Sequence, residues 1–299
     1  MPRARLANGI ELAYDAFGDP TSPPLVLIMG LGAQMILWEE DFCAELAAAG
    51  FHVVRFDNRD VGLSTQLDDL GVPNVFEAMQ AAFAGKPVQA PYRLEDMADD
   101  TVALMDVLGI ARAHVVGASM GGMIAQTIAI RHPDRLLSMT SIMSTTGDIT
   151  LPPATPEAMR VLLTPPPADR AGNVARALEA WKVIGSPKFP LDEDRMRALF
   201  ERAFDRGYHP AGVARQMAAI MASGDRTAAL RSVRVPSLVI HGDADPLVRV
   251  EGGRATAAAI PGAELVIVEG MGHDLPPGVW REIIDAVGEL AERARARRG

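Results

Sequence analysis

The sequence predicts an α/β protein with a mostly parallel, doubly wound sheet and an inserted helical cap. Three observations predict this fold class. Apolar runs without polar alternation are typical of parallel strands that helices cover on both faces. These runs alternate with helical patterns along the chain, as in doubly wound sheets. The alternation fails over residues 148–230, where a proline-rich stretch precedes several helical patterns, and we expect this segment to form the cap.

The first third of the chain begins with a turn and two buried strands. Residues 5–12 predict a hairpin that turns on Asn8-Gly9, because Asn-Gly is a strong hairpin signal. Residues 24–30 and 51–57 are apolar runs of the length of a buried strand, with a helix predicted between them over residues 39–49. A short helix is predicted over residues 75–84, inside an otherwise irregular stretch.

The later elements continue the pattern on both sides of the cap. Further strands are predicted at residues 114–116, 136–143, 236–241 and 264–269, and further core helices at residues 94–108 and 123–129. Prolines at 152–153, 156 and 165–167 exclude a central strand there, and helices are predicted at residues 172–184, 192–206 and 211–222. We therefore expect a core of residues 1–147 and 231–299, with the cap between them.

Composition narrows the function classes. The chain has 299 residues, and its formal net charge of −9 argues against a nucleic-acid partner, which requires a basic face. Cys43 is the single cysteine, so an intrachain disulfide is excluded. The start of the chain has no apolar core of a signal peptide, and no apolar run is long enough to span a bilayer. We expect a cytoplasmic protein without a membrane span.

The stretch VVGASMGG, residues 115–122, is the strongest chemical signal. Ser119 stands between Gly117 and Gly121, after a predicted buried strand and before a predicted helix. A Gly-x-Ser-x-Gly motif is weak evidence alone, but strand–turn–helix is the context that a nucleophile elbow requires. In such an elbow the residues two before and two after the serine crowd each other, so only small residues fit. We expect Ser119 to be a nucleophile.

A serine hydroxyl needs a base, and that base needs an orienting acid. His273 is the predicted base, because it lies in a glycine-flanked loop after the last predicted strand, where α/β active sites form. Asp245 is the preferred acid, since it follows the preceding strand and is held extended by Pro246. Asp243 is interpreted as a turn former, and Asp148 is the reserve candidate for the acid.

The remaining machinery is a pair of backbone donors for an oxyanion. The amide of Met120, directly after the nucleophile, is one candidate, and the amide of Leu31 in the glycine-containing loop at residues 29–33 is the other. This loop lacks the third glycine of G-x-G-x-x-G and a P-loop lysine, which disfavours nucleotide binding. Because no His, Cys or carboxylate cluster has metal-ligand spacing, we expect neither a metal nor a cofactor.

These motifs together resemble the α/β-hydrolase superfamily over nearly the full chain. The resemblance is carried by MGLG (29–32), DNRDVGLS (57–64), the elbow at Ser119, GDADP (242–246) and GMGH (270–273). The chain looks most like small, capped bacterial esterases, including the methylesterases of anthracycline polyketides such as aclacinomycin. Two positions depart from the pattern: many relatives have His where Met29 stands, and glycine where Asp60 stands.

The predicted activity is hydrolysis of small to medium, uncharged, moderately hydrophobic carboxylic esters through an acyl-enzyme. A substrate pocket is predicted from Met35, Trp38, Trp181 and Met217. The alternatives are a polyketide methylesterase, a cofactor-free perhydrolase or haloperoxidase, a carbon–carbon bond hydrolase on the same three residues, or a non-catalytic ligand receptor. Relatives that displace halide or open epoxides resemble one another in using aspartate at the elbow, so Ser119 argues against both. The sequence leaves the oligomeric state open.

Overall fold

The computed structural model describes residues 1–165 and 167–297, so Pro166 of the predicted proline-rich stretch lies outside the described residues. Its centre is a sheet with the strand order β1-β2-β4-β3-β5-β6-β7-β8. β1 and β2 are antiparallel and join the sheet antiparallel to β4, whereas the pairs from β4 to β8 are parallel. The predicted mostly parallel sheet is therefore confirmed. The strands are β1 (Arg3–Arg5), β2 (Glu11–Phe17), β3 (Pro24–Ile28), β4 (His52–Phe56), β5 (Ala113–Ala118), β6 (Leu136–Ile142), β7 (Ser237–Gly242) and β8 (Glu264–Val268).

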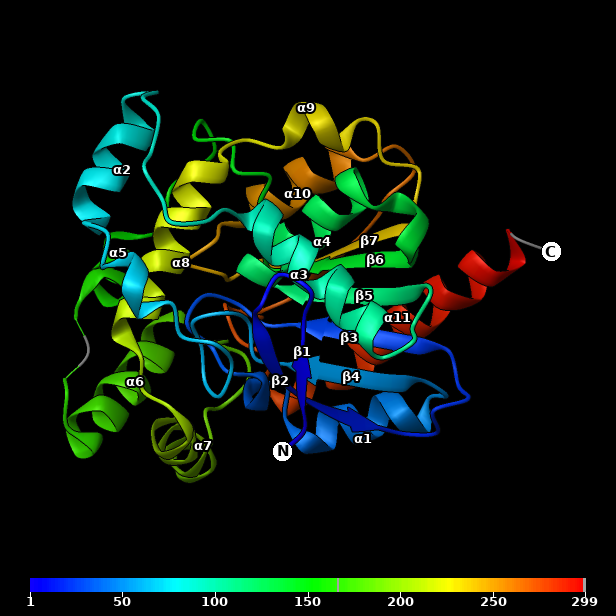
Figure 1. Cartoon of the computed structure of the whole chain (residues 1–299), viewed down its shortest axis with the longest axis horizontal. Coiled ribbons are helices and arrows are strands. Elements are labelled where there is room, and N and C mark those ends of the chain that lie inside the picture. The colour runs from blue at the N-terminus through cyan, green and yellow to red at the C-terminus, as the bar shows by residue number, and fades with distance from the viewer. Residues whose placement is uncertain (166, 298–299) are drawn as a thin grey trace.

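Helices cover both faces of this sheet and gather at one end of it (Figure 1). The covering helices are α1 (Glu40–Ala48), α3 (Leu94–Val107), α4 (Met120–Arg131), α10 (Val250–Ala259) and α11 (Pro277–Ala296). α2 (Val75–Phe83) precedes α3 in the chain. Between β6 and β7 lie α5 (Pro156–Leu163), α6 (Arg170–Ile184), α7 (Glu193–Arg206), α8 (Pro210–Ser223) and α9 (Thr227–Leu230). We call residues 148–230 the helical insertion; α5–α8 lie on the side to which the arrowheads of β3 and β4 point.

Strand β3 is apolar along its whole length because helices cover both of its faces. Leu25 and Leu27 of β3 pack with α1 and α11, whereas Val26 and Ile28 pack with α3 and α4. Side chains alternate across a strand with period 2, so a strand between two helical layers has no solvent-facing position. These four residues are at most 1% exposed. The continuous apolar run in the sequence thus corresponds to a strand between two cores.

Helices α5, α9, α10 and α11 are additional to the helices that the sequence analysis assigned. In α10 the reason is visible in Gly252 and Gly253, which lower the helical signal of the sequence. A Cβ on Gly253 would overlap the ring of His241 in β7, and one on Gly252 would press on Thr145. Close packing against the end of the sheet thus excludes side chains at both positions, and tertiary contact overrides weak local propensity.

The helical insertion is tied to the loop after β4 by a buried ion pair. Arg215 of α8 and Asp60 are each fully buried and make two hydrogen bonds, of 2.7 and 2.9 Å. The hydroxyl of Tyr92 also donates to Asp60, at 2.8 Å. Burial raises the pKa of Asp60, but these hydrogen bonds and the Leu67 amide outweigh it, so the pKa lies below its ordinary value.

Asp60 also explains one departure from the family pattern. Its φ of 67° lies in the left-handed region, which glycine occupies without strain and which aspartate tolerates better than most residues. The position where many relatives have glycine therefore keeps its backbone conformation here. The side chain that glycine lacks supplies the carboxylate for Arg215.

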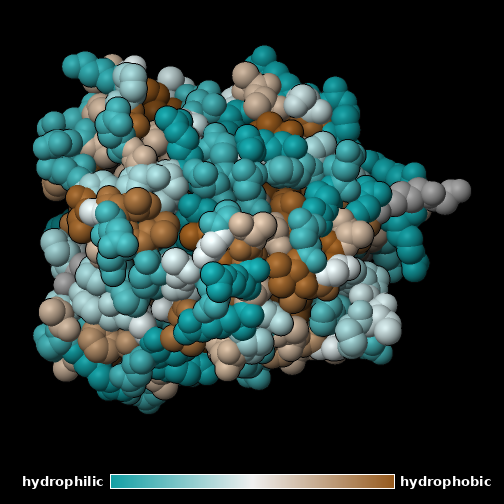
Figure 2. Space-filling view, in the orientation of Figure 1, coloured by the Kyte–Doolittle hydropathy of each residue, from teal (hydrophilic) through white to brown (hydrophobic). Residues whose placement is uncertain are grey.

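The surface over α2 carries apolar side chains. Exposed large apolar residues in this region are Leu70, Val72, Phe76 and Phe83. Figure 2 shows apolar patches interrupting the hydrophilic surface on the side of the molecule where α2 and the helical insertion lie. α2 packs against α8 of the insertion and buries Ala78. Across residues 1–165 and 167–297, no helix is long and apolar enough to cross a membrane.

The Asp60–Arg215 pair predicts a stability difference between single and double variants. Arg215→Met leaves the Asp60 carboxylate buried without its cation, and we expect it to lower the free energy of unfolding by about 3–5 kcal/mol. Asp60→Gly combined with Arg215→Met removes both charges and suits the positive φ, so most of this loss should be recovered. Urea unfolding at pH 7 measures both values; equal losses in the single and double variants would contradict the prediction.

Candidate active site

Ser119 lies at a sharp turn between β5 and α4. Its φ of 54° and ψ of −120° lie outside the regions that a residue with a side chain prefers, and such strain clusters at functional sites. The Ser119 amide donates to the carbonyl of Ile142 in β6, at 2.9 Å. The Ser119 carbonyl accepts hydrogen bonds from the amides of Gly122 and Met123, in the first turn of α4. The strained residue is thus hydrogen-bonded on both sides, and its side chain remains partly exposed.

The three glycines of the motif have different neighbours. A Cβ on Gly117 would overlap the backbone of Gly121, which is the crowding that the sequence predicts. A Cβ on Gly121 would in turn overlap the carbonyl of Ile28 in β3. Gly122 faces Ser141 and Ser144, at the end of β6, where a Cβ would lie within 2.8 Å of side-chain atoms. Gly122 therefore lets α4 pack close to the sheet.

Ser119, His273 and Asp245 form one hydrogen-bonded chain. His273 Nε2 lies 3.0 Å from Ser119 Oγ, and His273 Nδ1 lies 2.7 Å from Asp245 Oδ2. Because a carboxylate only accepts, we assign the ring proton to Nδ1, which leaves Nε2 free to accept from the serine hydroxyl. His273 is 8% exposed and Asp245 is 1% exposed. The structure thus brings together the three residues that sequence analysis selected from three separate loops.

The two oxygens of Asp245 have separate partners. Oδ1 accepts from the amides of Leu247 and Val248, at 2.8 and 2.9 Å, which leaves Oδ2 directed at His273. His241 contacts the same loop: its Nε2 lies 2.7 Å from the Val248 carbonyl. Burial lowers the pKa of His241 and so favours the neutral ring, which donates this hydrogen bond. His241 therefore supports the loop that carries the acid.

The other two aspartates considered for the site bind elsewhere. Asp148, the reserve candidate, accepts from the amide and hydroxyl of Thr150, at 2.8 and 2.7 Å, within its own turn. Asp243 was expected to shape its turn, but its carboxylate accepts from the amide of Gly270, at 2.6 Å. That contact joins the loop after β7 to the loop after β8. Asp148 is thus not brought to His273, and Asp243 connects the two loops that carry Asp245 and His273.

The loop after β3 passes directly beside Ser119. A Cβ on Gly30 would lie 3.1 Å from the Cβ of Ser119. The Gly32 amide donates to Gln216 at 2.8 Å and the Ala33 amide to the Gly30 carbonyl at 3.2 Å, so both are occupied. Within the described part of the chain, the amides of Leu31 and Met120 have no acceptor; Met120 is the first residue of α4, whose first amides lack intrahelical partners.

Two side chains that sequence analysis did not select hold this loop in place. Gln216 of α8 is fully buried; its Oε1 accepts from Gly32 and its Nε2 donates to the Arg59 carbonyl, both at 2.8 Å. Asn58 Nδ2 donates to the Met29 carbonyl at 3.0 Å. Asn58 belongs to the DNRDVGLS motif at residues 57–64, which the sequence analysis noted. Gln216 lies in a predicted helix, and a helical pattern does not indicate which groups a glutamine in it will bind.

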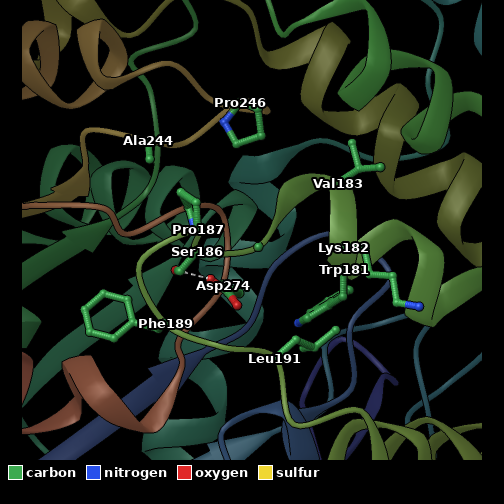
Figure 3. A pocket seen from close by; sticks show the side chains of 11 residues that line it. Trp181, Lys182, Val183, Ser186, Pro187, Phe189, Leu191, Ala244, Pro246 and Asp274 are labelled. Atoms are coloured by element: carbon green, nitrogen blue, oxygen red, sulfur yellow. Dashed lines mark hydrogen bonds between the residues drawn. The ribbon is translucent and has the colours of Figure 1, made fainter.

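The four predicted pocket residues have different environments in the structure. Met35 and Trp38 are 0% exposed and Met217 is 6% exposed. Met35 packs with α6 and α7 of the insertion, and Trp38 stacks on Phe42 with the ring centroids 5.6 Å apart. Trp181 lines a cavity of about 240 Å³ (Figure 3). Of the four, Trp181 alone is among the residues lining this cavity.

The cavity lies against both loops that carry the acid and the base. Its lining includes Ala244 and Pro246, on either side of Asp245, and Asp274, next to His273. Asp274 is 9% exposed, and Figure 3 shows it bonded to Ser186. Burial raises the pKa of the Asp274 carboxyl, and its hydrogen bond to Ser186 offsets this only in part. Among the described residues, no group of His, Cys, Asp or Glu is arranged to hold a metal ion.

The fold and the geometry at Ser119 define an α/β-hydrolase. A model of the alpha/beta hydrolase fold family matches residues 23–276, and the chain belongs to this family. It is similar to the rhodomycin D methylesterases of Streptomyces sp. strain C5 and of Streptomyces peucetius. Both are 29% identical to it; the matches cover 93% and 96% of this chain, and 94% and 97% of those proteins.

A solved structure extends the likeness to the whole chain. The enol-lactonase of Burkholderia xenovorans LB400 is 25% identical, with a TM-score of 0.69, and the match covers 99% of this chain and 100% of that one. The likeness therefore includes the helical insertion as well as the sheet.

One added methyl group is expected to have opposite effects at a glycine of the elbow and at a glycine of α11. Gly121→Ala places a Cβ against the Ile28 carbonyl, and we expect it to lower the free energy of unfolding by about 1–3 kcal/mol or more. Gly288→Ala, in α11, meets no atom within 4 Å and should raise it by up to about 1 kcal/mol. Thermal melts of both variants check this; an unchanged melting temperature for Gly121→Ala would contradict the steric argument.

Proposed function

We propose that the protein is a serine hydrolase that cleaves carboxylic esters through an acyl-enzyme. The observation that carries this proposal is the hydrogen-bonded chain from Ser119 Oγ through the His273 ring to Asp245. A hydroxyl, an imidazole and a carboxylate in this order make up the arrangement that activates serine for acyl transfer. The strained backbone at Ser119 supports the same reading, because a nucleophile elbow presents its hydroxyl in this way.

In the first half of the reaction Ser119 attacks the ester carbonyl while His273 Nε2 takes the hydroxyl proton. Asp245 stabilises the imidazolium that forms. The tetrahedral oxyanion accepts hydrogen bonds from the amides of Leu31 and Met120, both without an acceptor among the described residues. Proton transfer of this kind contributes about 10²–10⁴-fold, and each oxyanion donor about 10²–10³-fold.

The first half ends when the C–O bond to the alcohol breaks and His273 gives its proton to the departing alcohol, which leaves the acyl group on Ser119; the second half is hydrolysis of this acyl-enzyme. Water then enters, loses a proton to His273 Nε2 and attacks the acyl carbon. The same two amides hold the second oxyanion. Ser119 is released when His273 returns the proton to its oxygen, and the acid product leaves with the free enzyme restored.

The substrate class follows from the helical insertion and the relatives. We assign the insertion, residues 148–230, the role of a cap over Ser119, since α5–α8 lie beyond the carboxyl ends of the strands (Figure 1). The cavity beside the loops of Asp245 and His273 is lined by the apolar side chains of Trp181, Phe189 and Leu191 and by the charged side chains of Lys182 and Asp274. The apolar part of this lining favours moderately hydrophobic esters. The two rhodomycin D methylesterases, similar over nearly the whole chain, favour a methyl ester as the bond cleaved.

Substitution of the nucleophile is the first test. We expect wild type to hydrolyse p-nitrophenyl esters from acetate to octanoate, and Ser119→Ala to lower kcat/KM by about 10³-fold or more. Initial rates at 405 nm measure both. Equal rates for the two proteins would end the hydrolase proposal in favour of a non-catalytic ligand receptor.

The same preparation separates the remaining alternatives. Methyl esters of bulky aromatic acids, compared with ethyl and butyl esters of the same acids, test the methylesterase assignment. Peroxide-dependent halogenation, or cleavage of a vinylogous diketone, with no turnover of any ester would replace the esterase by a perhydrolase or a carbon–carbon bond hydrolase.

The acid is tested by a pair of isosteric substitutions. Asp245→Asn removes the charge beside the His273 ring, and we expect kcat to fall by roughly 10²–10⁴-fold. Asp148→Asn alters a carboxylate bound within its own turn and should leave kcat within about 2-fold of wild type. The p-nitrophenyl acetate assay compares them, and a larger loss from Asp148→Asn would reverse the assignment.

A further inference from the structure

The loop that carries His273 is bound, residue by residue, to the helical insertion. The His273 amide donates to the Ile184 carbonyl at 2.7 Å. On one side of it, the Gly272 amide donates to the hydroxyl of Ser186 at 2.8 Å. On the other side, Asp274 accepts a hydrogen bond from that same hydroxyl. Three consecutive residues of this loop are therefore held by the stretch 184–186, which begins at Ile184, the last residue of α6.

The two stretches are also packed without space between their backbones. A Cβ on Gly272 would overlap the Gly185 carbonyl, and one on Gly185 would lie 3.2 Å from the Asp274 carboxylate. Further along, the Lys188 amide donates to the Gly270 carbonyl at 3.3 Å. Movement of either stretch would break these contacts together, because backbone meets backbone with no flexible side chain between them.

Ser186 is the side chain that connects both neighbours of His273. It is 6% exposed, and its hydroxyl accepts one hydrogen bond and donates the other, which uses its proton and one lone pair. Asp274 has no ion pair within the described part of the chain, while the cavity's Lys182 pairs with Glu179 and Glu193. A buried carboxylate without a cation depends on its hydrogen bonds, so the position of Asp274 is tied to Ser186.

We propose that Ser186 is a positioning residue for His273, through which the helical insertion sets the orientation of the catalytic base. This inference rests on the proposed function, since it assigns a role relative to the base. The Ser186 hydroxyl holds Gly272 and Asp274 in register on either side of His273. The imidazole then meets Ser119 at 3.0 Å and Asp245 at 2.7 Å without a conformational search.

Loss of this hydroxyl affects the chemical step more than substrate binding. Ser186→Ala removes both hydrogen bonds and leaves the Asp274 carboxylate and the Gly272 amide buried without their partner. Since a small misplacement of a catalytic group costs up to about 100-fold, we expect kcat for p-nitrophenyl acetate to fall by roughly 10- to 100-fold, with KM within 2-fold. The rate at which phenylmethylsulfonyl fluoride inactivates the enzyme at Ser119 should fall by a similar factor.

Three further variants complete the test. Ser186→Cys keeps the shape but weakens both hydrogen bonds, and should show the same loss in kcat even where Ser186→Ala folds poorly. Asp274→Asn keeps a carbonyl acceptor for the Ser186 hydroxyl and should retain kcat within about 3-fold. Ser237→Ala, the matched control, removes a buried hydroxyl bonded to Val235 at the other end of β7 and should change neither constant.

Each outcome either supports or overturns the proposal. Unchanged kcat in folded Ser186→Ala or Ser186→Cys overturns it, and so does a rise in KM with kcat unchanged, which would make Ser186 a substrate-binding residue. If Ser119→Ala is inactive while the Ser186 variants equal wild type, the proposed function stands and this inference alone fails. Wild-type activity in Ser119→Ala would instead remove the proposed function itself.

Discussion

The contact between the backbones of Gly117 and Gly121 is the constraint on which the site depends. It closes the angle between β5 and α4, and Gly121 in turn lies against the Ile28 carbonyl of the neighbouring strand. A strand that turns so sharply into a helix forces the residue between them to φ 54°, at a cost of about 1–3 kcal/mol. The surrounding sheet holds that conformation, since Ser119 is hydrogen-bonded to β6 and to the start of α4. Parallel strands on both sides of β5 then end at the same edge, which brings the loops after β3, β7 and β8 to the serine.

The helical insertion contacts this edge on two sides. α8 contributes Gln216, which occupies the Gly32 amide of the loop after β3. The last residue of α6, Ile184, and Ser186 beyond it bind the loop after β8 around His273. The insertion therefore takes part in the arrangement of the groups around Ser119. Because both contacts are buried, a conformational change of the insertion as a rigid body would disturb the groups on either side of the serine.

The sheet and the turn at Ser119 follow from local signals in the sequence. A strand between two cores is continuously apolar, as β3 is, and the glycines around Ser119 follow from the steric limit of a sharp turn. The pocket was predicted less well: Met35 and Trp38 are apolar whether they line a cavity or pack a core, and here they pack. Gln216, Ser186 and Asp274 leave no local signal, since their importance comes from partners 86 or more residues away that only the folded chain brings near. In α10, close packing requires Gly252 and Gly253, and these glycines weaken the helical pattern by which the sequence could have predicted the helix.

The ion pair between Asp60 and Arg215 makes the stability of the core and that of the helical insertion depend on each other. Asp60 occupies a position where many members of the family have glycine. Its carboxylate accepts two hydrogen bonds from the guanidinium of Arg215, which belongs to the helical insertion. Exchange of segments between relatives therefore leaves one charge of this pair without its partner in either direction. An insertion taken from this chain and placed on a core with glycine would bury Arg215 without its carboxylate, whereas this core under a foreign insertion would bury Asp60 without its arginine. A swap of insertions between relatives therefore requires that the residue at position 60 be exchanged with them.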